Sequence, residues 1–471
     1  MMNKMTIEDV LKATGAELIY SCIDKDNLDS NIISGIKHDS RDCGRGDMFV
    51  AIVGENRNGH DYISSVYEAG CRTVMVSEEG TWLEKLKSEG KAMNIIKTSD
   101  TEYAMGELAK SYLSGLNIKK VAVTGSVGKT SVRDMIYYVL SEKYCCGRNL
   151  KNYNNLIGLP LSIFQFGADI EAAVLEIGMD RFGEISRLSE IASPDIGVIT
   201  NIGVAHIEKL GSREGIFEAK MEMAPNIPPK ALGGCLVYAK DDYLNRERTA
   251  GDYDCVEIGF DSSCDYIISN VDDFGIEGIK FNVSFCDQRH HVHLPIPGAH
   301  NAVNATIPIA VGSLLGVGIT DAIRGLSKVQ LTGSRLKVIT GSSVTAIDDT
   351  YNANPKSMIG ALEVLDASPC EGRKVAILGD MYELGAESED LHRSVGEAAA
   401  AMNIDRLIAI GENARGIAKG AEGGNLAVSY FESKDSFYLK MAGLIGKNDL
   451  ILIKASRGMK LEEVVEKIIK L

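Results

Sequence analysis

The sequence predicts an α/β protein of three domains: a small N-terminal mixed α/β domain, a central parallel-sheet domain with a P-loop, and a C-terminal Rossmann-like domain. Its 471 residues exceed what one ordinary core holds, and at about 150 residues per domain they suggest three domains. Hydrophobic residues make up 45% and charged residues 24% of the chain, which is typical of globular proteins. Apolar, strand-length runs alternate with helix-length segments, as in parallel sheets.

The first expected domain covers residues 1–112. Met1–Thr14 predicts a short helix with charges spread through it, and it lacks the apolar centre of a secretory signal. Short strands are expected at Met48–Val53 and Thr73–Val76, among glycine-rich loops. A helix at Glu102–Leu113 then leads into the second domain.

The second expected domain covers residues 113–328. Its strands Val121–Thr124, Ala172–Ile177 and Ile196–Thr200 are largely apolar, which predicts burial on both faces of a sheet. Residues 270–294 predict an antiparallel insert. The uncharged stretch 301–320 contains polar residues and a proline, so we interpret it as a buried helix rather than a membrane span.

The third expected domain covers residues 329–471 and repeats the alternation of strands and helices. Polar or glycine-containing turns follow its apolar runs, as in a second, Rossmann-like sheet. The predicted strands are Val344–Ile347, Lys374–Leu378, Arg406–Ile410 and Leu450–Ile453.

Charge and cysteine usage limit the partners and the compartment. A net charge of -15 argues against a non-specific nucleic-acid partner, which favours a basic surface. The ten cysteines include no CxxC pair, a pattern typical of reduced thiols in the cytoplasm.

The clearest chemical signal is the sequence TGSVGKTS, which directly follows strand Val121–Thr124 and opens a predicted helix at Thr130–Leu140. Glycines let backbone amides turn toward phosphate oxygens, and a helix N-terminus favours anions. Val123 stands where the strict P-loop pattern has glycine, so this is the shorter GxxGKT form. The predicted nucleotide-binding loop consists of Thr124, Gly125, Ser126, Val127, Gly128, Lys129, Thr130 and Ser131.

Other polar residues follow the predicted strands. Glu176 ends one strand, His206 follows the next, and Lys220 lies on a predicted helix at Arg213–Met223. Glu176 is a hard oxygen ligand suited to Mg²⁺. On chemistry alone His206 could equally be a structural histidine, and Lys220 is better explained as a solvated helix residue. The run from Asp348 to Pro355 could serve ribose hydroxyls or a metal, or form an Asx-rich turn before a helix.

Three stretches of the sequence together resemble the Mur ligase family, the cytoplasmic enzymes that build the peptide stem of the bacterial cell wall. They are TGSVGKTS at Thr124–Ser131, ITNIGVAHIEKLGSREGIFEAKMEM at Ile199–Met223 and PGAHNAVNA at Pro297–Ala305. Further stretches at Asp348–Met358, Leu378–Glu397 and Lys454–Val465 resemble the member that uses UDP-N-acetylmuramoyl-tripeptide (UDP-MurNAc-tripeptide) and D-alanyl-D-alanine (D-Ala-D-Ala).

The resemblance implies an ATP-dependent ligase that joins D-Ala-D-Ala to the tripeptide carboxylate through an acyl phosphate. It implies ATP and Mg²⁺ as cofactors and small-molecule substrates only, with no nucleic acid or membrane partner; we expect a monomer. The third stem residue is either lysine or diaminopimelate. A sibling amide ligase, of the third-residue or folylpolyglutamate type, and a P-loop ATPase or binding module that forms no bond are the alternatives.

The resemblance also implies roles for single residues. Lys129, Lys220, His206 and Arg335 would be catalytic, with Lys220 carbamylated. Thr130 would bind one Mg²⁺, and Glu176, His206 and Lys220 the other. Beyond the loop, ATP would contact His300, Asn301, Arg335 and Asp349. Substrate would contact Ser40, Arg41, Asn154, Asn155, Asn352 and Asn354. Departures from the family pattern occur at Val127, Val204, Asp180 and Arg181.

Overall fold

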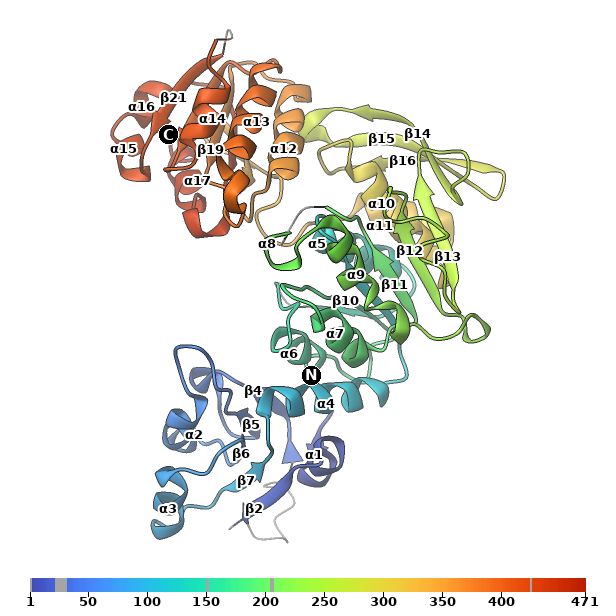
Figure 1. Cartoon of the computed structure of the whole chain (residues 1–471), viewed down its shortest axis with the longest axis vertical. Helices are drawn as coiled ribbons and strands as arrows, with labels where there is room; N and C mark the ends of the chain where they lie inside the picture. Colours follow the sequence, from blue (N-terminus) through green and yellow to red (C-terminus); the bar gives the residue numbers. More distant parts are fainter. Residues whose placement is uncertain (1, 22–31, 150–151, 204–206, 424–425) are drawn as a thin grey trace. The chain divides into compact units, whose positions relative to one another are not determined.

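The computed structural model describes residues 2–21, 32–149, 152–203, 207–423 and 426–471 (Figure 1). The chain divides into two compact units. The first contains Met1–Val123, Tyr144–Gly197 and Glu222–Gly234, and the second contains Thr124–Lys143, Val198–Met221 and Cys235–Leu471. The predicted domain limits, 1–112, 113–328 and 329–471, remain predictions.

The N-terminal part of the first unit is built on a five-stranded sheet in the order β2-β7-β6-β5-β4. Only the β2–β7 pair is antiparallel. Helices α2 (Ile63–Glu68) and α3 (Thr81–Ser88) pack on it through an apolar core. The strands are β2 (Glu17–Ser21), β4 (Gly35–Lys37), β5 (Asp47–Val50), β6 (Thr73–Val76) and β7 (Asn94–Lys97).

The predicted helix at Met1–Thr14 is wrong at its start. Helix α1 spans Ile7–Thr14, because the Thr6 hydroxyl accepts a hydrogen bond from the Asp9 N–H and the Asp9 carboxylate accepts one from the Thr6 N–H. This capping box fixes the first turn. Met5–Thr6 instead forms strand β1, which pairs with β3 (Ile32–Ile33).

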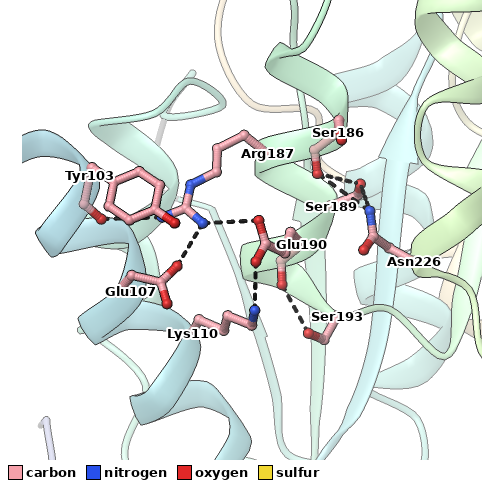
Figure 2. A network of polar contacts seen from close by, with 9 residues as sticks. All are labelled: Tyr103, Glu107, Lys110, Ser186, Arg187, Ser189, Glu190, Ser193 and Asn226. Carbon is pink, nitrogen blue, oxygen red and sulfur yellow. Dashed lines mark hydrogen bonds and ion pairs between the residues drawn. The ribbon is translucent and has the colours of Figure 1, made fainter. Parts of the chain in front are cut away.

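Two helices of the first unit, α4 (Thr101–Ser114) and α7 (Glu184–Ala192), are joined by the polar network in Figure 2. The Arg187 guanidinium donates to Glu107 at 2.6 Å and to Glu190 at 3.0 Å, and it lies 4.0 Å from the centre of the Tyr103 ring. Lys110 donates to Glu190 at 2.7 Å. The network therefore links the helix that ends the N-terminal part to the part that follows it.

Strands β8 (Lys119–Thr124), β10 (Ala172–Glu176) and β9 (Cys146–Arg148) are parallel and lie in the order β8-β10-β9. All five residues of β10 are buried, as its apolar run predicts. The register places Glu176 opposite Val123, one residue before the predicted phosphate loop. Helices α6 (Gly158–Ile163) and α7 follow β9 and β10 in the chain. The predicted strand at Ile196–Thr200 is β11, Ile196–Ile199.

The second unit contains strands in the order β16-β15-β14-β13-β12. Strands β14, β15 and β16 are antiparallel, which confirms the predicted insert. Helix α10 packs on α5, and the predicted buried helix 301–320 ends at Leu314. The bounds are β12 (Cys235–Ala239), β13 (Asp254–Gly259), β14 (Tyr266–Asp273), β15 (Ile279–Phe285), β16 (Gln288–Leu294), α5 (Lys129–Leu140), α8 (Ile207–Leu210), α9 (Arg213–Met221), α10 (Asn301–Leu314) and α11 (Ile319–Ser327).

The C-terminal part of the second unit is a six-stranded sheet in the order β17-β18-β22-β19-β20-β21, parallel except for β17. Alternate strand residues point to opposite cores, so helices cover both faces (Figure 1). Helices α12, α13 and α14 cover one face, and α15 and α17 the other. The bounds are β17 (Lys337–Thr340), β18 (Thr345–Asp349), β19 (Lys374–Gly379), β20 (Arg406–Ile410), β21 (Ala427–Phe431), β22 (Leu450–Lys454), α12 (Pro355–Ala367), α13 (Ser388–Ala400), α14 (Arg415–Gly420), α15 (Lys434–Tyr438), α16 (Met441–Leu444) and α17 (Glu462–Ile468).

The nine cysteines that the structure describes are free thiols. Within the described ranges, no helix combines the length and apolar character needed to cross a membrane.

Candidate nucleotide-binding site

The predicted phosphate loop has the strand–loop–helix geometry that anion binding requires. Strand β8 ends at Thr124, and helix α5 begins at Lys129, one residue earlier than predicted. Gly125 and Gly128 have φ angles of 147° and 84°, in the region that disfavours residues with a Cβ atom. A Cβ on Gly125 would lie 1.9 Å from Thr200 Oγ1. The loop therefore needs glycine at this position for both conformation and space.

The residues that follow β11 form hydrogen bonds with the phosphate loop. The Asn201 side chain accepts a hydrogen bond from the Val127 N–H at 3.0 Å and donates one to the Val127 carbonyl at 2.8 Å. Thr200 donates to the same carbonyl at 2.6 Å, and the Gly203 N–H donates to the Ser126 hydroxyl at 2.8 Å. These contacts use only the backbone of Val127, so its departure from the family pattern leaves the loop geometry intact. Sequence reasoning did not single out Thr200 or Asn201.

Lys129, Thr130 and Thr124 carry the polar groups of the loop. The Lys129 ammonium donates to the Gly125 carbonyl at 2.8 Å. Thr130 lies in the first turn of α5 and is 5% exposed. The Thr124 hydroxyl is buried and has no hydrogen-bond partner among the described atoms. Backbone amides at a helix N-terminus, a lysine and hydroxyl groups fit a nucleotide phosphate with its Mg²⁺.

Lys220, on helix α9, is 2% exposed. Burial, and secondarily the positive charge of Lys129, hold the pKa of the Lys220 amine well below its usual range. Both effects disfavour the charged ammonium form and favour the neutral amine. We find no hydrogen bond or ion pair between this amine and another described residue. The contribution of the Lys129 charge to this pKa shift indicates that the two lysines lie near each other. The sequence spacing alone did not establish this.

Glu176, at the end of β10 in the first unit, is held by two asparagines. The Asn154 amide donates to Glu176 Oε1 at 2.8 Å. Asn149 exchanges two hydrogen bonds with the Glu176 backbone, at 2.5 and 3.0 Å. Asn155 accepts a hydrogen bond from the Gly158 N–H at the start of α6. Glu176 is only 2% exposed, and its carboxylate is oriented by Asn154. The predicted ligand His206 lies outside the described residues.

Asn301, at the start of α10, connects the expected adenine segment to the phosphate loop. Its amide donates to the Pro297 carbonyl at 2.6 Å, and its carbonyl oxygen accepts from Asn304 at 2.8 Å. Asn304 in turn faces Gly128, where an added Cβ would lie 3.1 Å from Asn304 Oδ1. The Asn304 side chain, which is hydrogen-bonded to Asn301, therefore lies against the phosphate loop at Gly128.

The neighbouring His300 is an exposed residue, although many protein atoms surround its ring. Its ring lies against Gly298 and faces Gly360 of helix α12. The surrounding protein, and then the charges of Lys356 and Lys454, lower the pKa of His300 to about 4. The ring is therefore neutral near pH 7, which suits stacking or hydrogen bonding to an uncharged base.

Asp349 and Lys454 are paired residues on the adjacent parallel strands β18 and β22. The Lys454 ammonium lies 2.6 Å from Asp349 Oδ2 and also donates to the Asn352 carbonyl at 2.8 Å. The Leu336 N–H donates to Asp349 Oδ1 at 3.2 Å. Burial raises the pKa of Asp349, and the neighbouring Lys454 opposes that rise. Sequence reasoning placed Lys454 in a family-like stretch but did not identify it as the partner of Asp349.

Arg335 directly precedes Leu336, whose N–H donates to Asp349, and the positive charge of Arg335 opposes the raised pKa of that carboxyl. Its guanidinium donates to the Thr332 carbonyl at 2.9 Å and lies 3.8 Å from the centre of the Tyr351 ring. A cation over an aromatic face gains electrostatic attraction. Arg335 therefore has one defined orientation in this structure.

The remaining predicted substrate residues occupy turns. Ser40 and Arg41 lie in a short helix at Ser40–Asp42; the Arg41 side chain is 81% exposed and pairs with Asp39 at 2.5 Å. Asn352 is exposed. Asn354 accepts a hydrogen bond from the Ser357 N–H and caps α12. Asn354 therefore forms the Asx-type turn before α12 that the sequence allows, and its proposed substrate contact stays a prediction.

The second unit thus brings together the loop, Lys220 and the Asn301 support. It also brings Arg335, Asp349 and Lys454 together. Ser40, Arg41, Asn154, Asn155 and Glu176 belong to the first unit. Within the described part of the chain, no three His, Cys, Asp or Glu side chains are grouped as a metal site.

Comparison with known proteins places this arrangement in a family. Residues 32–113 match the Mur ligase family catalytic domain, residues 123–312 the Mur ligase middle domain, and residues 334–457 the Mur ligase glutamate ligase domain. The UDP-N-acetylmuramoyl-tripeptide–D-alanyl-D-alanine ligase of Bacillus subtilis is 36% identical, over 100% of this chain and 99% of its own length.

Two solved structures are also similar. The MurF crystal structure from Acinetobacter baumannii has a TM-score of 0.88 and 29% identity, over 99% of each chain. The MurF ligase from Thermotoga maritima in complex with ADP has a TM-score of 0.80 and 26% identity, over 92% of this chain and 97% of that one. Fold, phosphate loop and matches define an ATP-dependent ligase with three α/β domains. The chain belongs to the Mur ligase family.

Proposed function

We propose that this chain joins D-Ala-D-Ala to the carboxylate of UDP-MurNAc-tripeptide, with ATP converted to ADP and phosphate, in peptidoglycan precursor synthesis. The observation that carries the proposal is the full-length likeness to a ligase of that name together with the glycine-dependent phosphate loop. The proposed enzyme acts as a monomer in the cytoplasm. Light scattering of the purified chain tests the oligomeric state.

In the proposed reaction, a tripeptide carboxylate oxygen attacks the γ-phosphorus of ATP, and the bond to the β–γ bridging oxygen breaks, giving an acyl phosphate and ADP. The D-Ala-D-Ala amine then attacks the acyl carbon, and phosphate leaves. Lys129 and Arg335 neutralise charge on the transferring group, the main contribution of a protein to phosphoryl transfer. Correct orientation of the reactants contributes on the order of 7–11 kcal/mol, which gives three substrate-binding domains a physical purpose.

Two Mg²⁺ positions are proposed, on the chemistry of the residue types alone. Thr130 is proposed to hold one ion, and Glu176, His206 and carbamylated Lys220 the other. When bound, Mg²⁺ supplies positive charge opposite the phosphate oxygens. In its neutral form the buried Lys220 amine can add CO₂ and release a proton to give a carbamate anion, and the positive charge of Lys129 favours an anion there.

The other proposed roles concern substrate and nucleotide. Ser40 and Arg41 are proposed to contact the uridine part of the substrate, and Asn154, Asn155, Asn352 and Asn354 the muramoyl peptide or the acceptor. His300 and Asn301 are proposed to contact adenine, and Asp349 the ribose. The proposed domains remain 1–112 for the UDP-substrate, 113–328 for ATP and 329–471 for the Rossmann-like part.

Phosphate release from ATP tests the function, measured with UDP-MurNAc-tripeptide in the presence and absence of D-Ala-D-Ala. Release that requires both substrates, with a product heavier by the dipeptide, is expected. Release without the dipeptide would support a bare ATPase, and activity only with another amino acid and a shorter acceptor would support a sibling ligase. Lys129→Ala is expected to abolish release while the fold persists.

Carbamylation of Lys220 has its own test. Carbon-13 NMR of the protein in ¹³C-bicarbonate is expected to show a carbamate signal that Lys220→Ala lacks. The same variant is expected to lose activity and to regain part of it with short-chain carboxylates. Rescue by amines but not by acids would contradict a carbamate.

A further inference from the structure

We infer that Asp134 is a positioning residue that ties the phosphate-loop helix to the segment carrying Arg335. The inference rests on the proposed role of Arg335 at the ATP phosphates. Asp134 lies on α5, five residues after Lys129, and its side chain has 0% exposure. Five residues of α-helix rise about 7.5 Å along the helix axis, so a rigid helix sets the spacing between the loop lysine and Asp134.

The first connection crosses 198 residues of sequence. Asp134 Oδ2 accepts a hydrogen bond from the Thr332 N–H at 2.6 Å. The other oxygen, Oδ1, accepts from the Arg133 guanidinium at 2.6 and 3.0 Å. Because Arg133 fixes the carboxylate from one side, the direction in which Oδ2 points is also fixed. Charge-assisted hydrogen bonds of this kind are about twice as strong as neutral ones.

The second connection runs from Thr332 to Arg335. The Thr332 residue that donates to Asp134 also accepts, through its carbonyl, from Arg335 at 2.9 Å. Between them Gly333 has a φ angle of 82°, and a Cβ there would lie 3.4 Å from the Tyr351 ring. The positive φ angle fixes the turn with glycine at position 333, and the hydrogen bond to the Thr332 carbonyl couples the Arg335 guanidinium to the position of Thr332.

The far end of the same turn is fixed as well. The Tyr351 N–H donates to the Ser334 carbonyl at 3.2 Å, and the Leu336 N–H donates to Asp349 at 3.2 Å. The segment 332–336 is thus held by Asp134 on the phosphate-loop helix at one end and by Asp349 on β18 at the other. Two carboxylates from different parts of the second unit define where Arg335 lies.

Asp134→Ala removes the acceptor, and Thr332→Ala is the matched control because it keeps the backbone N–H. Hydrogen exchange of the Thr332 amide reads the tether directly, without ligands. We expect exchange to be at least about tenfold faster in Asp134→Ala and unchanged in the control, since an amide that loses its only protecting bond exchanges through local opening. An unchanged exchange rate of the Thr332 amide in Asp134→Ala would overturn the inferred connection between Asp134 and Thr332.

Kinetics then read the effect on Arg335. A charge-assisted bond corresponds to about a tenfold change in rate, so kcat of Asp134→Ala is expected to fall about that much. The KM for ATP should change less than about threefold, because Arg335 acts mainly on charge that develops in the transition state. Adding Asp134→Ala to Arg335→Ala should cost little more than Arg335→Ala alone. Multiplicative losses, or an unchanged kcat, would overturn the positioning role.

Two further results separate the possible failures. If Arg335→Ala keeps full activity, the proposed role of Arg335 fails, and with it the kinetic part of this inference; the exchange result still decides the tether. If Asp134→Ala does not fold because the buried Arg133 guanidinium loses the Asp134 carboxylate, Arg133→Leu with Asp134→Leu removes both charges together. That double variant should show the same fast Thr332 exchange and the same loss of kcat, and normal values would refute the inference.

Discussion

Replacing Lys454 by methionine is expected to destabilise the C-terminal sheet strongly and in a pH-dependent manner. The side chains of Lys454 and Asp349 are 3% and 11% exposed and lie 2.6 Å apart. Methionine keeps most of the apolar stem but leaves a buried carboxylate without its partner. Removing one member of a buried ion pair costs about 3–5 kcal/mol, and the Asn352 carbonyl loses a donor as well.

The pH dependence follows from the carboxyl group that remains. Burial already raises the pKa of Asp349 above its ordinary value of 3.8, and the loss of Lys454 removes the main opposing influence. A group with a raised folded-state pKa stabilises the fold most at low pH and loses that contribution as pH rises through the folded pKa. The difference in unfolding free energy between wild type and variant should therefore be large at pH 7.5 and narrow toward pH 4.

Denaturant unfolding of the full chain, followed by circular dichroism at pH 7.5 and pH 4, measures this difference. Lys454→Met with Asp349→Asn should recover part of the loss, since no unpaired charge is then buried. Lys419→Met is a control at an exposed pair, 47% and 69% exposed, and should cost less than about 1 kcal/mol. A loss below about 1 kcal/mol in Lys454→Met, an equal loss at both pH values, or no recovery in the double variant would refute the reasoning.

Three other predictions concern the loop and the first unit. Gly125→Ala should lower ATP-dependent phosphate release at least about a hundredfold, because its Cβ would lie 1.9 Å from Thr200 Oγ1; near-normal release would mean that the loop rearranges freely. Asn201→Ala removes two hydrogen bonds to Val127 and should raise the KM for ATP about tenfold, as measured by initial rates, whereas a normal KM would show that the support is dispensable. Arg187→Met should lower the unfolding free energy by about 1–2 kcal/mol in a denaturant titration, because Glu107 loses the Arg187 donor and Glu190 keeps only Lys110; an unchanged midpoint would contradict a role for the network.

Local patterns predicted the buried strands well. Thr73–Val76 and Arg406–Ile410 have the bounds expected from their apolar runs, since strands covered on both faces contain few polar residues. Strand β17 was not predicted, because Lys337–Thr340 is largely exposed at a sheet edge and has no distinctive pattern. The antiparallel pairing of β2 with β7 was not predicted either, because it joins segments that are far apart in the sequence.

The candidate site also contains a part that local patterns predict and a part that they do not. The phosphate loop is a local motif, and its glycines, lysine and helix could be predicted from eight consecutive residues. Asn201, Lys454 and Asp134 could not, because their partners lie 74, 105 and 198 residues away in sequence. Such contacts depend on strand register and helix packing, which single-sequence patterns do not determine.

The backbone-only contacts of Val127 have a consequence for sequence searches. Asn201 and Thr200 contact this residue through its N–H and C=O groups. The identity of the side chain can therefore vary among relatives without altering the loop. A pattern that demands a small or polar residue there would overlook functional members of the family. A saturation library at position 127, selected for growth in cells that depend on this ligase, should retain many residue types, whereas one at position 125 should retain glycine alone.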